Sequence, residues 1–195
     1  MYYSYKSIGD VLIIIFNNSL PMTKSERVGH VEVIYHDSEI IGYNIFDIKE
    51  IVKIKNEGMI YYPSETFLNI INSILINAHL SPLEKKDKSG YLVSEITDIK
   101  VLEKKRSLIT LRTEKETFKS VTSDSTLEVG DKVVVAIIDT FLNNGEIIKE
   151  MDVDGARITA HICTNYELGI KEGEERILLL DKDETIGEDF YKPEA

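Results

Sequence analysis

The sequence predicts an α+β domain followed by an all-β domain that forms a small barrel or a sandwich. The clearest amphipathic helix lies in the first half of the chain, and short strand-like runs between turn residues fill the second half. Residues 81–90 separate the halves as a polar, charged segment with a proline near its start and a glycine at its end. We therefore expect domains at 1–88 and 89–195. The 195 residues are 43% hydrophobic and 29% charged, which is typical of a globular chain with a buried core.

The first domain is predicted to contain several strands followed by one helix. Strand-like patterns are found at 10–16, 30–36, 40–46 and 51–55, with a hairpin turn at 37–39. The helix is expected to begin after Ser64, whose hydroxyl suits an N-cap, and to end before Pro82. Its apolar residues recur at helical spacing: Phe67, Leu68, Ile71, Ile74 and Leu75.

The second domain is predicted to be built from short strands alone. Strands are expected at 91–102, 108–112, 117–121, 132–138, 158–163 and 177–180. Turn residues separate them, for example at 143–145 and 154–155. This many short strands with little helix is typical of a small barrel or a sandwich.

The overall composition excludes several classes of protein. The net charge is -11, and the acidic excess falls mostly in the second domain. A single cysteine, Cys163, excludes an intrachain disulfide, and the apolar runs are far shorter than the ~20 residues that span a bilayer. The start of the chain lacks the basic and apolar segments of a secretory signal. We therefore expect a cytoplasmic protein that is not inserted in a membrane.

No pattern in the sequence predicts a metal site or a catalytic site. His161 and Cys163 are the best local ligand pair, but two ligands do not make a structural zinc site. The residues 152–155 begin like a calcium loop, yet position 161, where such a loop needs a glutamate, is His161. There is no Gly-x-Ser-x-Gly motif and no glycine-rich phosphate loop. We expect no metal, no cofactor, no catalytic residue and no small-molecule substrate.

One window of the second domain is basic, with seven cations and three carboxylates between residues 100 and 119. Its cations are Lys100, Lys104, Lys105, Arg106, Arg112, Lys115 and Lys119. In a barrel these residues would lie on the first three strands and their turns, where backbone phosphates of a nucleic acid are attracted by counterion release. Alternatively they are ordinary solvated residues between the buried side chains of Ile99, Val101, Leu108 and Leu111. Phe118 is the one aromatic residue that interleaves them.

The chain also resembles a known family, over essentially its whole length. The segments 90–93, 129–136, 163–164 and 167–170, with Gly155, are similar to the tRNA-binding domain of the phenylalanyl-tRNA synthetase beta subunit, of methionyl-tRNA synthetase tails and of the endothelial monocyte-activating polypeptide. The first half, with 42–46 and 64–67, resembles the N-terminal domain of bacterial YtpR-type proteins, which end in that same domain. The resemblance implies an oligonucleotide-binding (OB) barrel in the second half and a tRNA-binding function.

Several motifs that accompany RNA binding in this family are missing here. The loop between the first two barrel strands is deleted, Asp154 stands where the family has an arginine, and Ala160 replaces a glycine. Asp154 would repel a phosphate, and Ala160 limits the close approach of a ligand to the backbone. Lys104, Lys105 and Arg106 compensate in part, since three cations at a turn can hold a nucleic-acid backbone without reading bases.

We therefore expect a non-catalytic protein that binds tRNA or another structured RNA, with affinity weakened by the lost motifs. The seven cations of the window would contact phosphates, and His161 and Thr164 would line what remains of the pocket. The alternative is a protein–protein interaction module on a reassigned barrel, which the net charge of -11 favours. A homodimer is implied by the resemblance alone.

Overall fold

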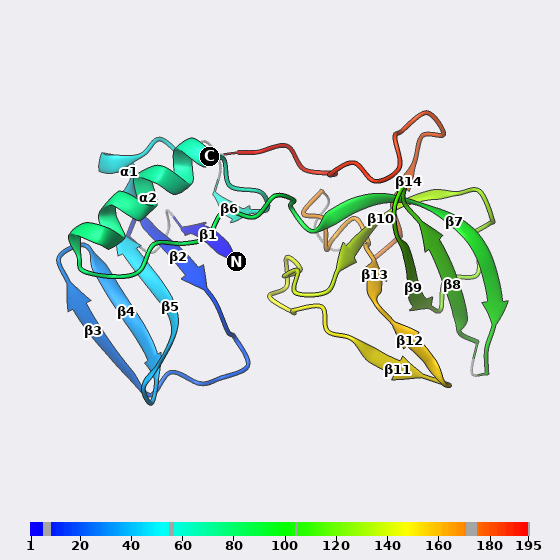
Figure 1. The fold of residues 1–195 in the computed structure, drawn as a ribbon, viewed down its shortest axis with the longest axis horizontal. Helices are drawn as coiled ribbons and strands as arrows, with labels where there is room; N and C mark the ends of the chain where they lie inside the picture. Colours follow the sequence, from blue (N-terminus) through cyan, green and yellow to red (C-terminus); the bar gives the residue numbers. More distant parts are fainter. Residues whose placement is uncertain (6–8, 55–56, 104, 171–174, 195) are drawn as a thin grey trace. The chain divides into compact units, whose positions relative to one another are not determined.

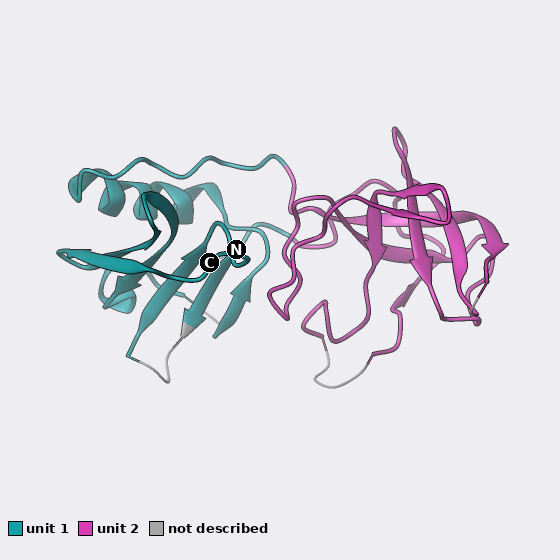
Figure 2. Cartoon of the chain, turned by 90° about the horizontal axis from the view of Figure 1, so that it is seen from below, with its two compact units in different colours: residues 1–87, 192–195 teal, residues 88–191 magenta. Residues whose placement is uncertain are grey.

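The computed structural model describes residues 1–5, 9–54, 57–103, 105–170 and 175–194. The chain divides into two compact units, one of residues 1–87 with 192–195 and one of residues 88–191 (Figure 2). Both units are mostly β, and each is built on its own antiparallel sheet.

The first unit contains a six-stranded sheet in the order β3-β4-β5-β2-β1-β6 (Figure 1). The strands are β1 (Tyr2–Tyr5), β2 (Val11–Ile15), β3 (Lys24–Val28), β4 (Val31–His36), β5 (Glu39–Phe46) and β6 (Gly58–Ile60). The predicted hairpin at 37–39 is the β4–β5 turn, where Asp37 has φ 52°. Aspartate is among the residues that tolerate this left-handed conformation in a turn.

Helix α2 (Glu65–Asn77) packs on one face of this sheet and confirms the predicted helix. The Ser64 hydroxyl is its N-cap and accepts a hydrogen bond from the Phe67 amide at 3.2 Å. Phe67, Ile71 and Leu75 enter the core of the unit. They join alternate residues of the central strands: Leu12, Ile14, Val31, Val33, Tyr43 and Ile45.

The prediction of a strand at 51–55 is wrong. Residues Ile48–Ile51 form the short helix α1, residues 52–54 are irregular, and Lys55 lies outside the described residues. Ile48 and Ile54 are buried in the core. The apolar residues of this segment are therefore explained by burial, although the segment does not form a strand. The sequence also fails to predict β3, because all five residues of this edge strand are exposed and no apolar alternation marks it.

The polar segment after α2 lies against that helix. The Asn72 side chain makes two hydrogen bonds with the backbone of Leu83, at 2.7 and 3.0 Å. Lys85 forms an ion pair with Glu65 at 2.7 Å. The expected linker is therefore part of the first unit up to residue 87.

The second unit is a nearly closed barrel with the strand order β13-β10-β7-β8-β9. Its strands are β7 (Tyr91–Val101), β8 (Ser107–Arg112), β9 (Thr117–Thr122), β10 (Lys132–Ile137) and β13 (Ala160–Ile162), with β14 (Leu179–Leu180) pairing β10. Between β9 and β13, the Thr159 amide donates to the Lys119 carbonyl at 2.9 Å and the Ile162 amide to the Ser120 hydroxyl at 3.3 Å. We call this β9–β13 boundary the seam.

The predicted strand at 158–163 is divided in two. Strand β12 (Ala156–Ile158) pairs with β11 (Met151–Val153) in a separate hairpin, and β13 joins the barrel after Thr159. The predicted turn at 154–155 closes that hairpin, with the Asp152 carboxylate accepting a hydrogen bond from the Gly155 amide at 3.0 Å. An Asp-Gly turn therefore forms in place of a calcium loop.

The barrel interior is apolar, because alternate residues of its strands point inward. The interior residues include Leu92, Ile96, Ile109, Leu111, Val133, Val135, Ala160 and Ile162. Gly90, which precedes β7, has φ 89°, and a Cβ atom there would lie 2.2 Å from the Thr140 hydroxyl oxygen. A glycine is therefore required where the chain enters the barrel.

The C-terminal segment is held at two places. Residues 187–190 lie along β7, where the Gly187 amide donates to the Val93 carbonyl at 2.8 Å and the Phe190 amide to the Tyr91 carbonyl at 2.9 Å. Farther on, the Glu194 amide donates to the Tyr62 carbonyl at 2.8 Å. Residues 192–194 therefore pack with the first unit, whereas the sequence assigned them to the second domain.

Candidate nucleic-acid interface

The outer face of β7, β8 and β9 carries part of the basic window. Residues paired across an antiparallel sheet point to the same side, so three cross-strand rows can be read from the register. The rows are Glu95–Arg112–Thr117, Asp98–Thr110–Lys119 and Lys100–Leu108–Val121. This strand face therefore carries carboxylates in two of the three rows that hold its cations.

The two arginines of the window are already paired. The Arg112 guanidinium lies 3.1 Å from the Glu95 carboxylate, in the same row. Arg106 lies 3.4 Å from the Asp154 carboxylate of the β11–β12 turn. Asp154, where the related family has a cation, thus neutralises a neighbouring cation of this chain.

The lysines of the window are exposed but are not gathered in one place. No ion pair is found for Lys100, Lys105, Lys115 or Lys119 within the described part of the chain, and Lys104 lies outside it. Lys105 is in the β7–β8 turn and Lys115 in the β8–β9 turn, at opposite ends of six-residue β8. At about 3.3 Å per residue, these turns are ~20 Å apart. The window therefore forms a scattered set of cations instead of one patch.

The alternative for the basic window, that its cations are ordinary solvated residues between buried side chains, is right in part. Leu108 and Leu111 are buried, as expected, whereas Ile99 is only half-buried. Val101 is 77% exposed and does not enter the core, because it lies at the very end of β7. Phe118 points inward and packs against the barrel core, so its partly buried ring is directed away from the cations of the outer face.

His161 and Thr164 come together through a residue that the sequence did not single out. The His161 imidazole lies 2.9 Å from one carboxylate oxygen of Glu167. The other oxygen accepts hydrogen bonds from the Thr164 amide at 2.8 Å and the Thr164 hydroxyl at 3.0 Å. Burial by itself raises the pKa of Glu167, but these hydrogen bonds and the His161 charge outweigh it and lower that pKa below its usual value.

The pair of His161 and Cys163 does not form a metal site. Cys163 is fully buried, and burial raises the pKa of its thiol, so the thiolate that a metal requires is disfavoured. Within the residues that the structure describes, no group of three or more His, Cys, Asp or Glu side chains is arranged to hold a metal ion. His161 is instead engaged by Glu167.

A cavity of about 450 Å³ opens at the seam, beside His161. We call it the seam pocket. The lining residues include the end of β9 and the segment that follows β13: Val121, Thr122, Ser123, Asp124, Asn144, His161, Ile162, Thr164, Tyr166, Glu167, Glu175 and Ile177. A second cavity of about 260 Å³ adjoins it and shares Val121 and His161. It contains more apolar side chains, among them Ile148, Met151 and Ile158.

Sequence reasoning finds His161 and Thr164 in this pocket but misses the others. Asp124, Asn144, Tyr166 and Glu175 come from separate loops, and no local motif links them. The weak signal in the sequence is the Thr164-to-Glu167 spacing, which suits a side-chain turn.

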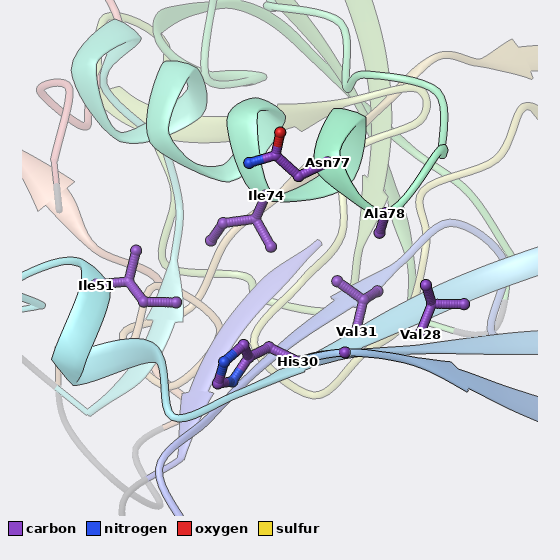
Figure 3. Close-up of a pocket in the computed structure, with 8 residues that line it drawn as sticks. Val28, His30, Val31, Ile51, Ile74, Asn77 and Ala78 are labelled. Carbon is purple, nitrogen blue, oxygen red and sulfur yellow. The ribbon is translucent and has the colours of Figure 1, made fainter.

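The first unit contains a different kind of cavity, of about 320 Å³ (Figure 3). Apolar side chains of the β3–β4 hairpin, α1 and α2 line it: Val28, Val31, Ile51, Ile74 and Ala78. Asn77 and His30 also line it, and the His30 imidazole lies 3.2 Å from the Asp47 carboxylate. The cavity therefore lacks the charge that would attract a nucleic acid.

None of the described helices is long and apolar enough to cross a membrane. The longest has 13 residues.

Known proteins match this chain in part of the first unit and over nearly its whole length. Residues 20–83 match a family described as a domain of unknown function (DUF4479). The chain is 27% identical to "Putative tRNA-binding protein YtpR" of Bacillus subtilis (strain 168), over 97% of this chain and 98% of that protein. It is also 27% identical to "Uncharacterized protein MG449 homolog" of Mycoplasma pneumoniae, over 78% of this chain and 67% of that protein. The family match lies entirely in the first unit, and the likeness to the Bacillus protein continues through the barrel and the seam. The chain is a relative of the YtpR-type proteins.

Proposed function

We propose that this protein binds tRNA or another structured RNA in the cytoplasm, without catalysing a reaction. The observation that carries the proposal is the likeness over nearly the whole chain to a protein named as tRNA-binding. The strand order and near closure of the barrel support its assignment as an OB barrel, which presents the faces of its second and third strands to nucleic acid. These strands are β8 and β9, and Lys119 points outward from β9.

The charges of the strand face support weak binding that follows the RNA backbone. Three cations of the strand face and of the β7–β8 turn have no ion pair among the described residues: Lys100, Lys105 and Lys119. Glu95 and Asp98 lie beside them and reduce the attraction for phosphate. Binding that relies on a few lysines is expected to discriminate RNA shape more than sequence.

In this proposal His161 and Thr164 line the seam pocket and do not contact phosphate. Both are hydrogen-bonded to Glu167, so a phosphate would have to compete with that carboxylate for them. We therefore assign phosphate contacts to the lysines and leave His161 and Thr164 outside that role.

The proposal is tested by fluorescence anisotropy with bulk tRNA at salt concentrations from about 50 to 200 mM, with duplex DNA as the competitor. The native protein should prefer tRNA, and its affinity should fall as salt rises. The variant Lys100→Ala/Lys105→Ala/Lys119→Ala should reduce the log–log salt slope by up to ~3.

A matched control is Lys53→Ala/Lys86→Ala/Lys182→Ala, which removes the same charge from exposed positions elsewhere. Its slope should stay close to that of the native protein. If both variants change the slope equally, the strand face is not the contact surface. If the native protein does not bind tRNA even at the lowest salt, the RNA-binding proposal is rejected.

A second candidate function is a protein-interaction module. The observation that favours it is the presence of carboxylates among the cations of the strand face, with both arginines neutralised. On this alternative the acidic barrel binds a basic partner or a second copy of the chain. Light scattering after size exclusion distinguishes a homodimer from a monomer, and a dimer without tRNA binding would support this candidate.

A further inference from the structure

The backbone of β9 faces the seam at alternate residues. The β8–β9 hairpin closes with Thr113 and Glu116 hydrogen-bonded, so hydrogen-bonded pairs alternate from there along the two strands. Lys119 and Val121 fall on the other set, so their backbone groups point away from β8. Lys119 bonds Thr159 across the seam. Val121 lies one step farther along, where the seam widens into the pocket.

The seam pocket contains the groups needed to hold a planar heterocycle. Its volume of about 450 Å³ falls in the range of small-molecule sites, with room for one nucleobase. Tyr166 and His161 supply rings among its described lining residues, and Ser123 and Asn144 supply neutral polar groups. Base recognition on single strands uses such a combination of aromatic side chains and hydrogen bonds to base edges.

The charge of the pocket selects against a phosphate. Both oxygens of Glu167 are engaged by His161 and Thr164. Asp124 accepts from Thr126 through one oxygen, Oδ1, and no partner is found for its other oxygen or for Glu175 among the described residues. These carboxylates accept hydrogen bonds and repel anions, so they favour a neutral ligand edge rich in donors.

We propose that the seam pocket receives one unstacked guanine base of a bound RNA. This inference rests on the proposed RNA-binding function. Guanine presents two neighbouring donors, the N1 imino group and the N2 amino group, and a single carboxylate can accept from both. Asp124 or Glu175 supplies that carboxylate, while the phosphate stays outside, on the side of the seam where Lys119 is exposed.

The smaller adjoining cavity fits the same arrangement. It shares Val121 and His161 with the seam pocket and is lined by Ile148 and Met151, and Met151 is 56% exposed. An apolar site next to the base pocket suits the stacked face of the neighbouring base, which needs no specific hydrogen bond.

The test uses a labelled RNA hexamer of five uridines and one internal guanosine. It is compared with the same hexamer in which inosine replaces the guanosine. Inosine lacks only the N2 amino group, so it loses one of the two hydrogen bonds to the carboxylate. The native protein should bind the guanosine probe about tenfold more tightly, the size expected for one hydrogen bond to a charged group. In Asp124→Asn/Glu175→Gln the ratio should fall to about one, because an amide cannot accept both donors.

The control variant is Glu103→Gln/Asp183→Asn, which removes the same charge from exposed residues that do not line the pocket. It should bind RNA slightly better but keep the tenfold ratio, so the ratio separates base reading from charge. Thermal unfolding of each variant confirms that it is folded.

Three results would overturn the inference. They are equal binding of the guanosine and inosine probes by the native protein, a ratio that persists in the Asp124→Asn/Glu175→Gln variant, and tRNA binding without binding of either hexamer. Each of these leaves the RNA-binding proposal intact if tRNA is bound in a salt-dependent way. Absence of tRNA binding rejects both proposals together.

Discussion

The strand face and the seam are two surfaces of one barrel, and they differ in how their polar groups are held. On the strand face, Arg112 and Glu95 form an ion pair on the exterior of the sheet. At the seam, Glu167 is only 15% exposed and is bonded through both carboxylate oxygens. The charged run of the sequence is thus dispersed over strands and turns, with both of its arginines ion-paired. Residues from separate segments form a concave and organised site at the seam.

This difference has a physical cause. Successive residues of a strand point to opposite sides, and turns place neighbouring cations at opposite ends of the sheet, so a linear cluster is dispersed on folding. A pocket requires walls from several segments, and the seam brings together residues 121–124, 161–167 and 175–177. Specific binding is therefore expected at the seam, and general electrostatic attraction at the strand face.

The largest expected effect is a loss of stability when a buried side chain of β13, the strand at the seam, is shortened. Ile162 lies on the seam strand β13, is 4% exposed and packs in the barrel interior. Ile162→Ala should reduce the free energy of unfolding by about 2–4 kcal/mol, because it leaves a cavity in the core. Urea unfolding measures this loss. Val101→Ala, at a position 77% exposed, should change it by less than about 0.5 kcal/mol, and similar losses for both variants would contradict the comparison.

A smaller effect is expected from the Glu167 carboxylate. Glu167→Gln keeps the shape of the side chain but weakens hydrogen bonds to His161 and Thr164, so about 1–2 kcal/mol of stability should be lost near pH 7. Since the pKa of Glu167 is lowered in the folded protein, its contribution is complete above 4.5, its ordinary value, and disappears as the pH falls through the lowered pKa.

The measurement for Glu167 is the difference in unfolding free energy between the native protein and Glu167→Gln as a function of pH. The difference should be constant above the ordinary pKa of 4.5 and should shrink in more acidic solution. A difference that does not change with pH would mean that the carboxylate charge plays no part in holding His161 and Thr164.

The smallest effect is expected for the ion pair on the strand face. A double-mutant cycle with Arg112→Ala and Glu95→Ala should give a coupling energy of about 0.2–1 kcal/mol, as is usual for exposed pairs, and added salt should reduce it. A coupling as large as the Glu167 effect would show that the strand face is as organised as the seam.

The parts of the fold that depend on local pattern were predictable. The N-cap Ser64 and the apolar spacing through Leu75 define α2 without reference to the rest of the chain. Alternating residues likewise predicted β4 and β8 closely. Edge strand β3 was missed because its exposed residues carry no apolar alternation, and its pairing with β4 is not visible in the local sequence. Residues 52–54 were wrongly predicted as a strand because Ile54 is buried by tertiary contacts and not by a sheet.

The candidate site shows the same division. The sequence by itself determined the helix, most barrel strands, the cation-rich window and the likeness to YtpR-type proteins, because each depends on residues close together in the chain or in the same order as in a relative. Tertiary structure alone decided that Arg106 and Arg112 are paired, that Phe118 points inward and that Asp124, Tyr166 and Glu175 surround one pocket. The physical reason is that charge pairing and cavity shape depend on distances in space, and chain closure at the seam sets those distances.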